Sequence, residues 1–247
     1  GRAQLFGDEK TTAQYASNPA IELHGPGRSK VILGADAAAN WREHLQVLVD
    51  SVAANGGRSC VNASCILTPA HGDEIADALA RELAQIEPTA SDDPSARLSA
   101  FANVKFADYI DAAIEAGLAK GGAEDVTARH RDGPRRREVD GATYLLPTIV
   151  RCDSLGHPLA NTEFLFPFAS VVEMPVEEML GAMGPSLVVS GITRDAALQR
   201  DLLASPHVER LNLGAVPTSR VDWDQPHEGN LFEFLYARRA IHRAQGW

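Results

Sequence analysis

The sequence has few cysteines and no long apolar run. Its 247 residues include three cysteines, Cys60, Cys65 and Cys152, which cannot form an even set of disulfides and do not show the C-x-x-C spacing of zinc or redox sites. This cysteine usage fits a reducing compartment, so we expect a cytoplasmic protein. No run approaches the roughly 20 apolar residues that span a bilayer, and the start, GRAQLFGDEK, lacks the apolar core of a signal peptide. We therefore expect no membrane segment.

Basic residues are outnumbered by acidic ones. There are 23 Lys and Arg against 33 Asp and Glu, which gives a net charge of −10. Proteins that bind duplexes or membrane surfaces usually carry a basic footprint, so neither nucleic acid nor membrane is an expected partner. Hydrophobic residues make up 45% of the chain, which is enough to build a core. The length fits one or two domains.

Apolar spacing predicts helices and strands in alternation. Helical spacing or composition occurs over residues 41–55, 71–86, 96–120 and 193–205. Short apolar runs predict strands over residues 64–68, 144–150, 168–172, 187–192 and 208–213. Strands that alternate with helices indicate a mostly parallel sheet covered on both faces. We therefore expect an α/β fold, a three-layer αβα architecture.

A run of three arginines, residues 135–137, follows the turn residues Asp132-Gly133-Pro134. The pattern is typical of a solvated loop or hairpin. A phosphate or anion site is the alternative, and we assign the run no chemistry.

Cys60 is the candidate nucleophile. It follows the stop residues Asn55-Gly56-Gly57 at the end of a predicted helix and precedes a predicted buried strand, with Arg58 as a nearby cation. A thiol with a pKa of ~8.5 needs nearby positive charge or aligned amides to ionise at neutral pH. The alternative is a buried, inert cysteine. Cys65 and Cys152 lie in or after apolar runs, so we expect them to react more slowly.

Glu22 is the candidate general base. It stands between Ile21 and a Gly/Pro-rich turn over residues 25–30, where a loop could present its carboxylate with little obstruction. The alternative is an exposed acid at the end of a helix or strand.

Together these segments resemble the aldehyde dehydrogenase superfamily, with five motifs in the family's order. The matches are Glu22-Leu23-His24-Gly25 to Glu-Leu-Gly-Gly, Asn55–Cys60 to Asn-x-Gly-Gln-x-Cys, Leu146-Pro147-Thr148-Ile149 to the Pro-Pro-Thr strand, Glu163-Phe164-Leu165-Phe166-Pro167 to Glu-Ile-Phe-Gly-Pro, and Arg210-Leu211-Asn212 to the Val-x-x-Asn strand. Five matches in order indicate membership far more strongly than any one of them does. The resemblance implies the fold of the family's catalytic domain.

The resemblance also implies a mechanism and site roles. Cys60 would attack an aldehyde to give a thiohemiacetal, a hydride would pass to NAD or NADP, and Glu22 would activate the water that hydrolyses the thioester. Backbone amides near Cys60 would supply part of an oxyanion hole. Glu163 would bind the nicotinamide ribose, with a helix-capping acid as the alternative. Gly7 would belong to the turn that meets the cofactor pyrophosphate.

The chain departs from the family pattern at several places. A longer turn, Pro26–Lys30, follows Glu22, Arg58 replaces a glutamine, and the closing segment reads Gln225-Pro226-His227-Glu228-Gly229-Asn230. We expect the catalytic, C-terminal half of a divergent member, inactive by itself, with the cofactor bound mainly by a region absent from this chain. We expect three divisions of the chain. Residues 1–20 are a remnant of the dinucleotide-binding region, residues 21–235 are the catalytic thiol domain, and residues 236–247 are a C-terminal tail.

Two other functional classes stay open. The chain could be a noncatalytic fragment or pseudoenzyme that acts in subunit association, or a relative that acylates coenzyme A, although that group generally lacks the glutamate matched by Glu22. No metal site is expected, because His24, His157, His227 and Glu228 lack ligand spacing. The expected partners are a small-molecule aldehyde and further copies of the chain in a homo-oligomer.

Overall fold

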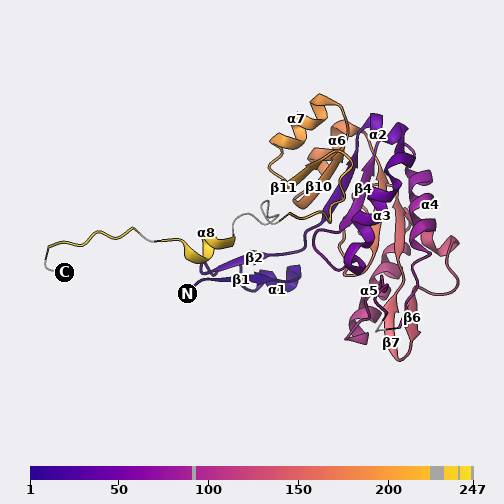
Figure 1. Cartoon of the computed structure of the whole chain (residues 1–247), viewed down its shortest axis with the longest axis horizontal. Coiled ribbons are helices and arrows are strands. Elements are labelled where there is room, and N and C mark those ends of the chain that lie inside the picture. The colour runs from indigo at the N-terminus through magenta and orange to yellow at the C-terminus, as the bar shows by residue number, and fades with distance from the viewer. Residues whose placement is uncertain (91–92, 223–230, 239, 246–247) are drawn as a thin grey trace. The chain divides into compact units, whose positions relative to one another are not determined.

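The computed structural model describes residues 1–90, 93–222, 231–238 and 240–245 (Figure 1). Its contacts divide the chain into two units. We call Gly27–Val221 the sheet unit, and Gly1–Pro26 together with Asp222–Trp247 the terminal unit. The functional division at residues 20 and 235 stays a prediction.

Seven strands in the described part of the sheet unit form one sheet, in the order β11-β10-β3-β4-β9-β8-β5. Neighbouring strands are parallel, except that β5 runs antiparallel to β8. The strands are β3 Ser29–Leu33, β4 Ala63–Thr68, β5 Ala123–Asp125, β8 Thr148–Cys152, β9 Phe168–Glu173, β10 Ser186–Ile192 and β11 Val208–Leu213. All residues of β3 and β4 are buried, as expected for central strands of a sheet that is covered on both faces. The predicted parallel sheet is confirmed.

Helices cover both faces of this sheet. One apolar cluster joins Val31 and Ile66 to the helices α2 Ala35–Ala39, α3 Leu45–Ala53 and α4 Gly72–Leu83. A second cluster joins Ile32 and Leu67 to α5 Val104–Leu118, α6 Val176–Ala182 and α7 Ala196–Ala204. Successive strand residues point to opposite faces, so Val31 and Ile32 enter different clusters, and the three-layer prediction is confirmed.

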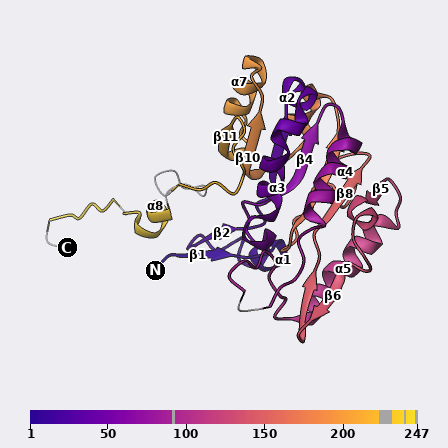
Figure 2. The same ribbon diagram turned by 45° about the vertical axis from the view of Figure 1, so that its right-hand side comes forward.

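In the described part of the sheet unit, three short 3-10 helices connect these elements, at Trp41–His44, Ala54–Gly57 and Val126–Arg129. Figures 1 and 2 both show α7 beside β11 and α5 beside β6, and Figure 1 also shows β7 next to α5. Among the described residues, no helix is long and apolar enough to cross a membrane.

The terminal unit contains a second, small parallel sheet. Strand β1, Ala3–Phe6, pairs with β2, Ile21–His24, and the short helix α1, Glu9–Ala13, lies between them in sequence. The register sets Gln4 opposite Glu22 and Phe6 opposite His24. A helix, α8, follows at Leu231–Tyr236.

The strand predicted over residues 144–150 is wrong in extent, because two strands share this run. Strand β7, Ala142–Leu145, forms an antiparallel hairpin with β6, Arg136–Val139, while β8 begins at Thr148. Pro147 separates them because it has no N–H to donate to a ladder. The pairing then changes partners: the Leu146 N–H donates to the Arg135 carbonyl, and the Thr148 N–H donates to the Pro167 carbonyl.

The helix predicted over residues 96–120 begins later, at Val104. The Asn103 side chain accepts the Lys105 N–H and caps the helix. Phe101 instead bridges to Thr143 in an antiparallel pair. Its ring is buried there, so tertiary packing overrides the helical composition of residues 96–103.

The hairpin predicted at the arginine run is confirmed, but Arg135 is not solvated. Its side chain is buried and donates to Asp111 and Asp125 at 2.6 and 2.8 Å. These carboxylates compensate the buried guanidinium charge, so Arg135 ties the hairpin to α5 and to the end of β5.

Candidate active site

Cys60 lies in the loop between the 3-10 helix Ala54–Gly57 and β4. It is half-buried, whereas Cys65 in β4 and Cys152 in β8 are buried. The Asn62 side chain shapes this loop: its oxygen accepts the Ser59 N–H at 2.9 Å, and its amide donates to the Ala54 carbonyl at 3.0 Å. These two hydrogen bonds therefore stabilise the conformation of the loop that carries Cys60.

Two glycines allow the Cys60 loop to pack closely against its neighbours. A Cβ at Gly27 would lie 2.1 Å from the Cys60 carbonyl oxygen, and a Cβ at Gly57 would lie 2.3 Å from the Pro167 nitrogen. Gly57 also has a φ of +66°, a backbone region that disfavours other residues. The Ser29 hydroxyl donates to the Cys60 carbonyl at 2.8 Å, so the start of β3 holds the backbone of the candidate nucleophile.

Glu163 contacts the same segment of chain. The Arg28 N–H donates to Glu163 Oε2 at 2.7 Å, and the Gly27 N–H also bonds the carboxylate. Burial raises the pKa of Glu163, while these backbone hydrogen bonds oppose the rise. The Glu163 carboxylate thus bonds backbone N–H groups of a loop, whereas the capping alternative expected it to bond those at the start of a helix. Cys60 and Glu163, far apart in sequence, both contact Gly27–Lys30.

Lys30 is a buried residue of this segment to which the sequence alone assigns no role. Its Nζ donates to the Arg28 carbonyl at 2.6 Å and to Ser186 Oγ at 2.9 Å. Burial lowers the pKa of Lys30 to about 8. The sequence placed Lys30 in a turn after Glu22, but Ser29 and Lys30 begin β3. The apolar run Val31-Ile32-Leu33 directly after Lys30 was the available signal for a strand.

The guanidinium group of Arg58 contacts the segment that precedes α5. The guanidinium carbon lies 4.6 Å from the centroid of the Phe101 ring, and the group donates to the Ser99 and Ala100 carbonyls at 3.1 and 2.9 Å. Cation–π contacts of this kind are attractive. Arg58 therefore anchors the residues that precede Cys60 to the segment around residue 100.

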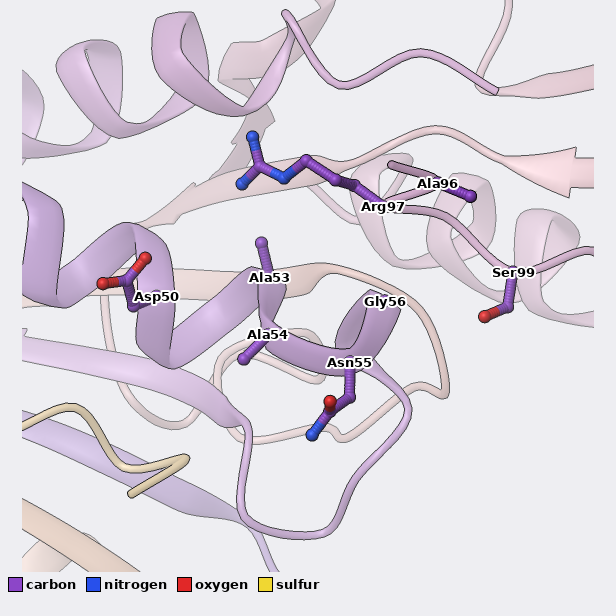
Figure 3. A pocket seen from close by; sticks show the side chains of 8 residues that line it. All are labelled: Asp50, Ala53, Ala54, Asn55, Gly56, Ala96, Arg97 and Ser99. Carbon is purple, nitrogen blue, oxygen red and sulfur yellow. The ribbon is translucent and has the colours of Figure 1, made fainter. Parts of the chain in front are cut away.

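A hollow of about 500 Å³ lies beside the 3-10 helix Ala54–Gly57, which precedes the Cys60 loop (Figure 3). Figure 3 shows Arg97 and Ser99 on one segment, across from Asn55 and Gly56 on the other. The hollow is also lined by Asp50, Ala53, Ala54 and Ala96. Cys60 is not a lining residue, so this hollow by itself does not place a substrate at the thiol.

Glu22 lies in strand β2 of the terminal unit, not on a loop, and it is half-buried. Its Oε2 accepts the Gln4 side-chain amide at 2.7 Å and lies 3.5 Å from His24 Nε2. This oxygen thus has a hydrogen bond from β1 and a close neighbour on β2. Each unit therefore carries one of the two candidate catalytic groups.

Gly7 lies between β1 and α1. Its N–H donates to the His24 carbonyl at 3.0 Å, and the next residue, Asp8, caps α1 by accepting the Thr11 N–H at 2.7 Å. This cap puts a carboxylate at the only helix start near Gly7 in the described part of the terminal unit. An acid there repels a phosphate.

Of the four residues considered as metal ligands, the structure describes His24 and His157. His157 Nδ1 accepts the Leu159 N–H at 3.1 Å and lies 3.8 Å from Cys152 Sγ, so the ring shapes its own loop. His227 and Glu228, with the rest of the closing segment 225–230, lie outside the described residues. In the part of the chain that the structure does describe, no three His, Cys, Asp or Glu side chains form a metal-binding group.

Comparisons with solved structures agree with this fold. An aldehyde dehydrogenase from Bacillus cereus, in an NAD+ complex, superposes with a TM-score of 0.75 at 16% identity, over 90% of this chain and 45% of that one. The aldehyde dehydrogenase KauB from Pseudomonas aeruginosa gives 0.73 at 19%, over 90% and 46%. Lactaldehyde dehydrogenase from Escherichia coli gives 0.70 at 16%, over 88% and 46%. This chain thus spans less than half the length of these proteins.

The sequence comparisons place the chain in a family. A search of curated proteins found no match. The model of the aldehyde dehydrogenase family, in contrast, matches residues 8–182, a range that includes Glu22, Cys60 and Glu163. The chain therefore belongs to the aldehyde dehydrogenase family.

Proposed function

We propose that this chain is the catalytic part of an NAD(P)-dependent enzyme that oxidises a small-molecule aldehyde to a carboxylate. The observation that carries the proposal is the setting of Cys60: a half-buried thiol on a turn braced by Asn62 and packed against Gly27, while Cys65 and Cys152 are buried. Membership of the aldehyde dehydrogenase family supports the same role.

In the proposed reaction, the Cys60 thiolate attacks the carbonyl carbon and forms a C–S bond, while the π electrons of the C=O bond move onto its oxygen and give an oxyanion. The oxidising power would come from NAD or NADP, which when bound would be the acceptor of the hydride that leaves this carbon as the C=O bond re-forms. The resulting thioester is hydrolysed by water: a C–O bond forms, Glu22 takes the water proton, and the C–S bond breaks with Cys60 as the leaving thiolate. Backbone N–H groups near Cys60 stabilise the oxyanion.

The residues of this chain fit the cofactor unevenly. The Glu163 carboxylate is held in place by the amides of Gly27 and Arg28, and a fixed carboxylate suits the hydroxyls of a ribose. Near Gly7, however, the Asp8 carboxylate already caps α1, and α1 is only five residues long. We therefore propose that Glu163 is the main cofactor contact in this chain and that Gly7 contributes only backbone groups to the cofactor site. Most of the binding energy for the cofactor comes from residues beyond this sequence.

The assembly we propose is a homo-oligomer.

The proposal is tested by Cys60→Ala in the full-length protein, with NAD(P)H formation measured over a panel of aldehydes. Loss of the nucleophile should lower turnover by ~1,000-fold or more. The matched control is Cys152→Ala, which removes a buried thiol in β8 and should keep turnover within about threefold. A Cys60→Ala protein that turns over normally would refute the role of Cys60. If the unmodified full-length protein forms no NAD(P)H with any aldehyde, the noncatalytic alternative is favoured.

A further inference from the structure

One face of the β1–β2 sheet carries a cluster of polar and aromatic side chains. Strand side chains alternate between faces, so Glu22 and His24 of β2 share a face. Gln4 and Phe6 lie directly opposite them on β1. All four residues belong to the terminal unit, so the cluster is complete within that unit.

Two side chains of the cluster approach the same carboxylate oxygen. The Gln4 amide donates to Glu22 Oε2 at 2.7 Å, and His24 Nε2 lies 3.5 Å from the same oxygen. The His24 ring stacks on Phe6, with 4.5 Å between ring centroids and 13° between planes. The stack restrains the ring while its nitrogen faces Glu22.

His24 Nε2 is otherwise unexplained. It is a buried polar atom without a hydrogen-bond partner among the described residues, and such atoms are rare because leaving them unpaired is costly. A small side-chain rotation would turn the 3.5 Å approach to Glu22 into a hydrogen bond. The family motif has a glycine where this chain has His24, so the resemblance supplies no role for this side chain.

We propose that His24 is a positioning residue for Glu22 in thioester hydrolysis. The inference rests on the proposed role of Glu22 as general base. With Gln4 donating to Oε2 and His24 turned to donate to the same oxygen, Oε1 is the oxygen that takes the proton of the attacking water. The water oxygen bonds to the thioester carbon, its proton moves to Oε1, and the C–S bond breaks to release the Cys60 thiolate. His24 loses and gains no covalent bond in this step.

The test separates acylation of Cys60 from deacylation. p-Nitrophenyl acetate acylates a reactive thiol without a cofactor: the nitrophenolate burst reports acylation, and the later steady rate reports deacylation. The full-length protein is compared with His24→Phe, which keeps a ring to stack on Phe6, and with His24→Gln, which restores an N–H near Glu22. His71→Gln is the control, since His71 lies in the sheet unit with its ring against Glu74.

We expect His24→Phe to leave the burst unchanged and to slow deacylation about tenfold, which is the effect of losing one hydrogen bond to a charged group. His24→Gln should recover the rate to within about threefold, and His71→Gln should not change it. The inference is overturned if His24→Phe deacylates at the unmodified rate, or if both His24 variants are equally slow, as a merely structural role would give.

Glu22→Gln, measured in the same assay, distinguishes this inference from the proposed function. If Glu22→Gln slows deacylation by ~100-fold and His24→Phe does not slow it, only the role of His24 fails. If Glu22→Gln deacylates normally, the general-base role itself fails, and the positioning role fails with it.

Discussion

Burial separates the three cysteines chemically. It raises the pKa of the Cys65 thiol to about 11 and that of Cys152 to about 12, so both are almost fully protonated near neutral pH, and the protonated thiol is not the nucleophile. Cys60 is half-buried on a loop. Access therefore favours Cys60, and the raised pKa values disfavour Cys65 and Cys152 as nucleophiles.

This difference predicts the order of alkylation. Iodoacetamide applied to the folded protein near pH 8, followed by peptide mapping, should label Cys60 first, with Cys65 and Cys152 reacting only after unfolding. The labelling of the unfolded protein is the control, since all three thiols should then react alike. Faster labelling of Cys65 or Cys152 than of Cys60 in the folded state would contradict the assignment.

Lys30 makes stability depend on pH. Burial lowers its folded-state pKa to about 8 from the ordinary lysine value of 10.5, so the unfolded chain binds the extra proton between these values and stability rises with pH there. The cost of burying the ammonium is fully present below about pH 8 and is lost by about pH 10.5. The difference between the two pKa values corresponds to ~3 kcal/mol.

The prediction concerns the difference between the unmodified protein and Lys30→Met. Urea unfolding at pH 7 and pH 10 should show the unmodified protein gaining stability relative to Lys30→Met as the pH rises. The comparison cancels the opposite effect of Cys152, whose raised pKa lowers stability as the pH rises above 9 in both proteins. A pH-independent difference would show that Lys30 does not carry a lowered pKa.

At the scale of elements, the turn before β3 fixes where the Cys60 loop can lie. Gly27→Ala should destabilise the fold by ~2 kcal/mol or more and slow alkylation of Cys60, because the new Cβ would meet the Cys60 carbonyl at 2.1 Å. Gly181→Ala is the matched control. Gly181 lies in α6, where an added Cβ would meet no atom within 4 Å, so alanine there should be neutral or stabilising by up to ~1 kcal/mol. Equal stabilities of the two variants would refute the close packing.

The elements that the sequence predicted well are those with a strong local pattern. Strands β4, β9 and β10 are apolar runs with turn residues nearby, and α4 keeps Ile75 and Leu79 on one buried face. Strand β3 was missed because Ser29 and Lys30 continue the polar composition of the preceding turn. Only the hydrogen bonds of their side chains, to partners such as the Cys60 carbonyl, make these polar residues suited to a core.

The candidate site was predictable only as far as sequence motifs extend. Cys60, Glu22 and Glu163 stand in recognisable motifs. The contact between Glu163 and the Arg28 amide spans 135 residues of sequence, and the burial of Arg135 depends on Asp111 in a separate helix. No local pattern encodes such partners, because tertiary packing brings them together.

At the scale of the whole molecule, the proposed chemistry involves both units. Cys60 and Glu163 belong to the sheet unit, and Glu22 with its positioning partner His24 belongs to the terminal unit. The central claim is that Glu22 is the general base in the hydrolysis of the Cys60 thioester. Ester and aldehyde assays on the full-length protein address this claim, whereas measurements on one unit cannot.

The most direct measurement is rapid-quench kinetics of Glu22→Gln in the full-length protein with an aldehyde and NAD(P). An amide cannot take a proton from water, whereas the hydride leaves carbon without that base. We predict a burst of about one NAD(P)H per site followed by slow turnover, with an acyl group mapped to Cys60 during the slow phase. The loss of a general base should lower steady turnover by ~100-fold. The account would be contradicted if Glu22→Gln lowered turnover by no more than about threefold and carried no acyl group on Cys60.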